Sequence, residues 1–268
     1  MEIASNGPRV KVETIKNHFK EKFIGESLTH IAIKNPKSYM IATWNEGLII
    51  IDEGKVIYSA RFPFKKDILR DLIYIKQFDS YFMDHDNQLY RKDINDKYAY
   101  VWMNIRCGFV SGGSFAYSDL NQKLIVNKDK DTISAVDLKA KKVEIEIPKS
   151  VGTGIFNFKI FGEKENQVAA ITEDANVVLY ELDYGRKKGA VVGHTKIDLI
   201  EDRKEKGIAL GVGDKGQFLL VEIRGCKAKY TYFSSRVAVL KVNGKSLTIS
   251  SIIDVFSQEI TQKNAIEC

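Results

Sequence analysis

Leu179-Tyr180-Glu181-Leu182 is the stretch that decides the fold, because four runs like it recur along the chain. Each is a short β-rich run that closes on an acidic residue, and the other four are Ile49–Asp52, Tyr90–Ile94, Ser134–Leu138 and Leu220–Ile223. The five acids stand 41, 44, 44 and 41 residues apart, and Val10–Glu13 extends the series 39 residues upstream of Asp52. A period of this size indicates a repeat architecture.

The chain between these acids breaks into short runs rich in Val, Ile, Tyr and Phe, separated by polar or glycine turns. The clearest unit has four such runs, at Lys196–Glu201, Gly207–Val212, Gln217–Glu222 and Lys227–Phe233. Four short antiparallel strands per repeat are typical of a propeller blade, whereas solenoid repeats of that length are helical. The sequence therefore predicts an all-β fold, a β-propeller of four-stranded antiparallel blades over residues 27–233.

The two ends of the chain bear on the number of blades. Arg236–Val242 and Leu247–Ile253 have the pattern of two further strands, and Arg9–Glu13 has that of one more. Pairing the N-terminal strand with the last blade would close the ring and remove two exposed edges. We expect a single propeller domain over residues 1–268 with about six blades, in which residues 1–26 contribute that strand; the alternative is an incomplete seven-bladed ring.

The repeat resembles that of the WD-repeat family, in which an acid closes the third strand and an Asp lies seven residues earlier in a tight turn. Asp174 precedes Glu181 by seven residues and Asp86 precedes Asp93 by seven. Gly193-His194 resembles the Gly-His that opens a WD repeat, although it occurs once and no unit has the family's Trp. The resemblance implies a propeller that serves as a platform for other proteins.

Several patterns could carry chemistry, but each has a simpler structural interpretation. His194 with Asp214 fits turn positions of the repeat, and Met83–Asp86 fits a surface turn better than a metal site. The glycine-rich runs at 111–114 and 211–216 precede strands, whereas a phosphate-binding loop precedes a helix. Cys107 has no nucleophile motif around it. We therefore expect no enzyme activity, no cofactor and no metal.

Composition bears on the ligands and the cellular location expected for the protein. The 41 Lys and Arg residues exceed the 35 Asp and Glu residues by six, a thin excess that favours solubility more than nucleic-acid binding. Three cysteines without a CxxC pair indicate neither a disulfide framework nor a zinc site. The N-terminus lacks signal-peptide features, and no apolar run is long enough to span a membrane. A cytoplasmic protein without membrane insertion is expected, and a nuclear one is also compatible.

Basic turns and one aromatic pair are the candidate partner-binding residues. Lys141 and Lys142 follow one strand marker, Lys187 and Lys188 follow the next, and turns of the same type emerge on one face of a propeller. Phe62 and Phe64 flank a proline in a predicted connection, where exposed aromatics make good interface anchors.

The sequence thus predicts a non-catalytic protein–protein interaction scaffold, a subunit or module of a larger intracellular complex. The partners are other proteins, which fold alone cannot name. Nucleic-acid or anionic-surface binding through the basic turns is the alternative, though no aromatic residues alternate with these lysines to stack bases. An enzyme with its active site in the central channel is the least favoured alternative, because the predicted innermost strands are mostly apolar.

Overall fold

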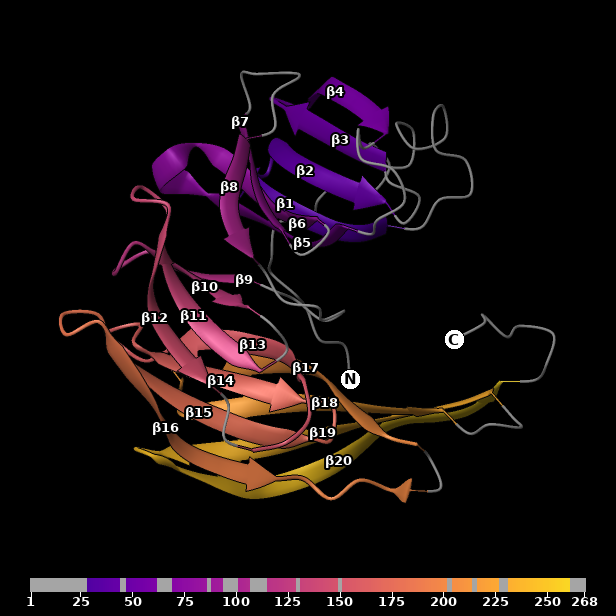
Figure 1. Cartoon of the computed structure of the whole chain (residues 1–268). Helices are drawn as coiled ribbons and strands as arrows, with labels where there is room; N and C mark the ends of the chain where they lie inside the picture. The colour runs from indigo at the N-terminus through magenta and orange to yellow at the C-terminus, as the bar shows by residue number, and fades with distance from the viewer. Residues whose placement is uncertain are drawn as a thin grey trace. The chain divides into compact units, whose positions relative to one another are not determined.

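The fold was determined as a computed structural model, which describes residues 28–43, 47–61, 69–85, 88–93, 101–106, 115–128, 131–148, 151–201, 204–213, 216–226 and 231–260. These residues form five four-stranded antiparallel sheets, and strands that are neighbours in the chain are neighbours in each sheet (Figure 1). The chain divides into two compact units, Met1–Met103 and Asn104–Cys268. The predicted propeller architecture of four-stranded blades is confirmed. The predictions for a strand at Arg9–Glu13 and for a single domain lie outside what the described residues test.

The first unit contains the first two sheets, except for the end of β8 beyond Met103. The first sheet consists of β1 (Leu28–Asn35), β2 (Ser38–Thr43), β3 (Gly47–Asp52) and β4 (Lys55–Arg61). The second consists of β5 (Leu69–Ile75), β6 (Ser80–His85), β7 (Gln88–Asp93) and β8 (Val101–Arg106), with a short 3-10 helix at Lys76–Phe78. Met40 and Leu48 of one sheet pack with Tyr81 and Met83 of the other in a shared core.

The second unit contains three sheets. The third sheet consists of β9 (Phe115–Ser118), β10 (Lys123–Asn127), β11 (Thr132–Asp137) and β12 (Lys142–Pro148). The fourth consists of β13 (Ile155–Phe161), β14 (Gln167–Thr172), β15 (Asn176–Asp183) and β16 (Lys188–Lys196). The fifth consists of β17 (Lys206–Gly213), β18 (Phe218–Cys226), β19 (Thr231–Asn243) and β20 (Ser246–Ile260).

The fourth sheet has two buried faces, which explains its nearly continuous apolar sequence. Successive side chains of a strand point to opposite faces. Val168 and Ala170 of β14 accordingly pack toward the third sheet, in a core with Ile125 and Ile145. Their neighbours Ala169 and Ile171 pack toward the fifth sheet, in a core with residues of β18 and β19 such as Leu219, Val221 and Leu240. Stacking of sheets through both faces is how a propeller builds its core.

The fifth sheet corrects the predicted frame of the last repeat. Lys196–Glu201 was expected to be its first strand, but β16 ends at Lys196 and Ile197–Ile200 is not a strand. The marker Glu222 therefore lies in the second strand, β18, instead of the third. The strands predicted for a further blade are β19 and β20, the third and fourth strands of this sheet. The described residues consequently form five sheets, where about six blades were expected.

Candidate partner-binding face

Four of the five marker acids share one position, opposite the first residue of the second strand of their sheet. Ser80 lies opposite Asp93 and Gln167 opposite Glu181. The hydroxyl of Ser38 donates to the Asp52 carboxylate at 2.7 Å, and that of Ser80 donates to Asp93. In the third sheet, the Lys123 ammonium lies 2.6 Å from an oxygen of Asp137. Three of these acids therefore tie the second strand to the end of the third.

The acid of the tight turn is also an anchor. Asp174 Oδ1 accepts from the Thr153 N–H at 2.9 Å and from the Thr172 hydroxyl at 2.7 Å, and Oδ2 accepts from the Asn176 amide at 2.8 Å. Burial alone raises the pKa of this carboxyl, but these donors and the Thr153 hydroxyl hold it well below its usual range. Threonine and asparagine thus supply the donors around this turn acid, whose predicted turn position is confirmed.

Gly152, in the connection before β13, packs against this turn at a place where a side chain would clash. Its φ is +79°, in the left-handed region that favours glycine. A Cβ there would stand 2.7 Å from Thr172 Oγ1 and 2.9 Å from Asp174 Oδ1. The network on this side of the fourth sheet is therefore structural.

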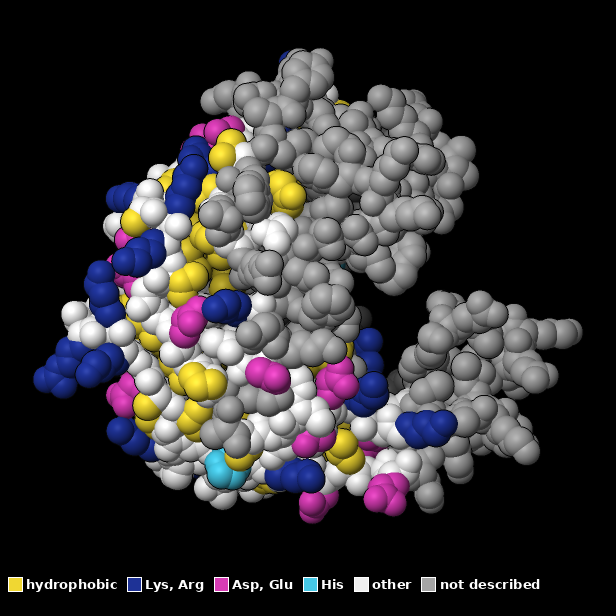
Figure 2. Space-filling view, viewed as in Figure 1, with side chains coloured by type: hydrophobic (Ala, Val, Ile, Leu, Met, Phe, Trp, Pro, Cys, Tyr) yellow, Lys and Arg dark blue, Asp and Glu magenta, His cyan; other side chains and the backbone are white. Residues whose placement is uncertain are grey.

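A surface that we call the basic ridge lies at the other end of the strands. It comprises six residues of the β11–β12 and β15–β16 connections and the strand ends beside them, namely Lys139, Lys141, Lys142, Arg186, Lys187 and Lys188. The structure places the turns of Lys141, Lys142, Lys187 and Lys188 on neighbouring sheets. Their predicted role as a binding site stays a proposal. Figure 2 shows dark-blue Lys and Arg side chains along the left edge, where Figure 1 shows the β15–β16 turn.

Glu144 of β12 links the two turns. Its Oε1 lies 2.7 Å from the Lys187 ammonium, and its Oε2 lies 2.8 Å from the Lys123 ammonium, which also contacts Asp137. Hydrogen bonds from Lys123 and Lys187 hold the pKa of Glu144 below its usual range. The Ala140 N–H and the Lys123 ammonium do the same for Asp137. These contacts bring residues of the third and fourth sheets into one electrostatic network.

The ridge carries more positive charge than its neighbours neutralise. Among the described residues, Lys139, Lys141, Lys142 and Lys188 are exposed and have no ion-pair partner. Three carboxylates adjoin the ridge, and each already contacts a cation, since Asp183 lies 3.7 Å from Arg186. Counted with Lys123, seven cations face these three carboxylates, a local excess of four positive charges.

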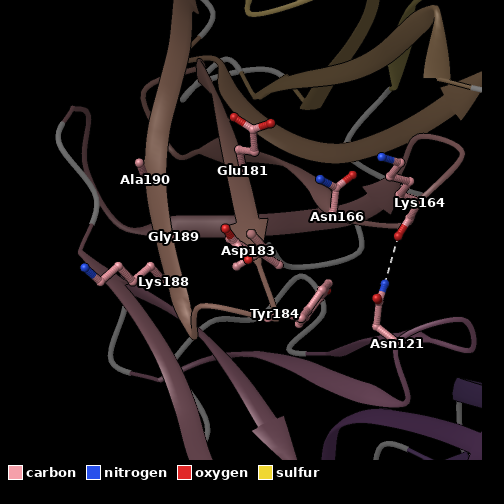
Figure 3. Close-up of a pocket in the computed structure, with 11 residues that line it drawn as sticks. Asn121, Lys164, Asn166, Glu181, Asp183, Tyr184, Lys188, Gly189 and Ala190 are labelled. Atoms are coloured by element: carbon pink, nitrogen blue, oxygen red, sulfur yellow. Dashed lines mark hydrogen bonds between the residues drawn. The ribbon is translucent and has the colours of Figure 1, made fainter.

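A pocket of about 650 Å³ opens beside the ridge, between turns of the third and fourth sheets (Figure 3). Lys164 and Lys188 extend on opposite sides of it, with Asp183 between them. Asn121 donates from its amide to the Lys164 carbonyl at 2.8 Å, and Glu165 accepts from the Ser118 hydroxyl at 2.8 Å. Burial raises the pKa of Tyr184, on the pocket wall, to about 12. The pocket is therefore built on two sheets that are fastened together.

The other residues considered in the sequence lie outside the ridge or outside the described residues. Phe62 and Phe64, like Asp214, Asp86 and Cys107, lie outside the described residues. His194 was expected in a turn, but it lies within β16, exposed and opposite Val178, because the strand pairing of β15 and β16 continues to Lys196. In the described part of the chain, no group of three His, Cys, Asp or Glu side chains is placed to hold a metal ion. The described residues also include no helix long and apolar enough to span a membrane.

Sequence reasoning missed Glu144 and Lys123, the residues that join the ridge. They stand 21 residues apart, on strands at opposite sides of β11, and Lys187 comes from another sheet. The local signal is the alternation of charged and apolar residues along β12, which is typical of any strand with one solvated face. Their association is a consequence of strand pairing.

Comparison with known proteins supports the fold. No family model and no curated protein match the sequence. The chain is similar to the β-propeller domain of Myceliophteria thermophila Cps50 (Swd1), at 10% identity and a TM-score of 0.63, over 87% of this chain and 75% of that one. It is also similar to KlHsv2 with loop 6CD replaced by a Gly-Ser linker, at 11% identity and a TM-score of 0.53, over 85% of each chain.

A third similar chain belongs to the structure of S. cerevisiae dbp5 l327v bound to nup159, gle1 h337r, ip6 and adp. The identity is 13% and the TM-score 0.55, and the match covers 90% of this chain and 63% of that one, less than two thirds of its length. Likenesses at these identities concern the fold, and they confirm a β-propeller.

Proposed function

We propose that this propeller is a non-catalytic protein–protein interaction scaffold, a subunit or module of a larger intracellular complex, and that the basic ridge is one of its binding surfaces. The observation that carries the proposal is the bridge from Lys187 through Glu144 to Lys123. It holds turns of two sheets together before any partner arrives. A preformed surface loses less conformational entropy on binding.

Two further observations support this proposal. The hydrogen-bonded turn acid Asp174 and the strand-closing acid Asp137 fit a divergent WD-repeat protein, a family of interaction platforms. One similar chain comes from an assembly, in which dbp5 is bound to nup159 and gle1. A role as a subunit is consistent with that setting.

Co-purification tests the proposal. Three tagged proteins are recovered from cell extract at low salt: the natural chain, a ridge variant (K141E, K142E, K187E, K188E) and a control variant (K55E, K76E, K196E, K241E). The control changes the net charge equally at four exposed lysines outside the ridge. We expect a stoichiometric partner with the natural chain and the control, and its loss from the ridge variant.

The outcomes separate two parts of the proposal. Recovery of no stoichiometric partner with any of the three proteins would contradict the scaffold function. Equal recovery with the ridge variant would leave the scaffold and exclude the ridge as its surface. Thermal unfolding of all three proteins checks that they are folded.

The unpaired lysines also favour a second candidate, binding of nucleic acid or another anionic surface. Phosphate contacts release counterions, so such binding weakens steeply as salt rises. Retention of nucleic acid by the purified natural chain and not by the ridge variant would support this candidate over the scaffold.

A further inference from the structure

The basic ridge favours anionic ligands because each of its carboxylates is already paired with a cation of the chain. Glu144 lies between Lys123 and Lys187, Asp137 contacts Lys123, and Asp183 contacts Arg186. The cations outnumber them, and Lys141, Lys142 and Lys188 have no ion-pair partner in the described part of the chain. A ligand that contacts this surface therefore meets available ammonium groups from two sheets.

The backbone of the ridge holds these lysines in place. Lys141 has a φ of 51° and Lys187 a φ of 53°, so each occupies the left-handed position of its turn. The Ala140 N–H donates to Asp137 at 2.8 Å, and the Arg186 N–H donates to Asp183 at 2.9 Å. Each turn is thus closed by the acid that ends the preceding strand, and the lysine directly before the next strand projects outward in both.

From this arrangement we propose that the basic ridge binds an extended acidic segment of a partner protein. Carboxylates of the segment pair with Lys141 and Lys142 on one turn and with Lys188 on the other, while Lys187 keeps its contact with Glu144. This inference rests on the scaffold function proposed above and names the chemistry of the partner. The pocket bordered by Lys188 gives the segment room for a side chain next to the ridge.

Two features favour an acidic peptide over nucleic acid. The ion pairs of Glu144 and Asp183 interrupt the unpaired lysines, so spaced carboxylates match these lysines better than a continuous phosphate backbone does. Single strands also bind through stacking on aromatic side chains. Tyr184, an aromatic residue of the β15–β16 connection, is half-buried, and its hydroxyl donates to the Glu165 carbonyl at 3.2 Å.

Fluorescence anisotropy tests the inference with a fluorescein-labelled peptide of ten glutamates as the probe. The natural chain, the ridge variant K141E/K142E/K187E/K188E and the control variant K55E/K76E/K196E/K241E are titrated in 50 mM NaCl. We expect saturable binding to the natural chain and the control. The ridge variant should lose about tenfold or more in affinity, because several charge contacts, each weak by itself, are replaced together by repulsion. Binding also weakens in 300 mM NaCl.

A labelled single strand of twenty thymidines, titrated in parallel, supplies the competing outcome. Tighter binding of this strand than of the peptide would overturn the inference in favour of nucleic acid. Absence of peptide binding, or an equal loss in the control variant, would overturn it as well. In that case, a partner that co-purifies with the natural chain and not with the ridge variant would leave the scaffold function standing.

Discussion

Arg236 and Glu205 form a buried, two-pronged ion pair in the second unit. The Arg236 Nε donates to Glu205 Oε1 at 2.9 Å, and Nη2 donates to Oε2 and to the Asp198 carbonyl, the latter at 2.8 Å. The Glu205 side chain is fully buried and also accepts from the Ile200 N–H at 2.7 Å. The pair therefore ties the connection before β17 to β19, across the fifth sheet.

Breaking this pair is expected to destabilise the protein strongly. Arg236→Met leaves a buried carboxylate without its cation, which costs about 3–5 kcal/mol of unfolding free energy. The measurement is urea denaturation followed by circular dichroism. The control is Arg224→Met, which breaks the more exposed pair with Glu222 and costs about 1 kcal/mol or less. Equal losses in the two variants would show that the buried pair has no special role.

Gly152→Ala tests the packed turn. The new Cβ meets Thr172 Oγ1 and Asp174 Oδ1 at a positive φ, so we expect a loss of about 2–3 kcal/mol in unfolding free energy. Gly54→Ala is the matched control, because its φ of +75° is similar but nothing lies within 4 Å. That variant should lose only about 1 kcal/mol. The same denaturation experiment measures both, and a loss from Gly54→Ala as large as that from Gly152→Ala would refute the steric argument.

Asp174 should contribute to the acid sensitivity of the fold. Because its folded pKa lies below the unfolded value of 3.8, its contribution is present above pH 4 and is lost as the pH falls further. Asp174→Asn should therefore be less stable than the natural chain at pH 7, and the difference should shrink toward pH 3. Thermal unfolding between pH 7 and pH 3 measures this difference. A difference that stays constant with pH would contradict the assignment.

Lys123→Met tests the centre of the network beneath the ridge. Its side chain is 16% exposed, and its ammonium contacts both Asp137 and Glu144. Removing it leaves two neighbouring carboxylates with fewer donors and costs about 1–3 kcal/mol. Lys128→Met is the control, since its pair with Glu146 is more exposed. The difference in unfolding free energy between Lys123→Met and the natural chain should shrink at acid pH, where these carboxylates become protonated. Urea denaturation at pH 7 and pH 3 checks both expectations, because the pKa values of Asp137 and Glu144 lie below their usual range in the fold.

Much of the fold was predictable from local patterns. Runs such as Ser134–Leu138 and Leu179–Leu182 carry an acid at nearly constant spacing, and the structure confirms that these acids, Asp137 and Glu181, lie on the third strand of their sheets. The turn position of Asp174 followed from its distance to Glu181. The lysine-rich turns could be assigned to one type of connection for the same reason, since each follows a strand marker.

The last repeat shows where local patterns stop. Residues 196–201 have the composition of a strand, and Glu222 continues the period, yet β16 ends at Lys196 and Glu222 lies in the second strand of its sheet. In the fold, the Asp198 carbonyl accepts from Arg236 and the Ile200 N–H donates to Glu205, and Arg236 lies 31 residues beyond Glu205 in the chain.

Local sequence specifies the repeated four-stranded blades of this chain, because alternation of apolar residues and turn chemistry act between near neighbours. The division of the final strands among sheets, and the charges that meet at Glu144 and Glu205, follow from tertiary packing. Those choices depend on burial and on pairing between distant strands, and a buried charge requires a partner wherever in the chain that partner lies.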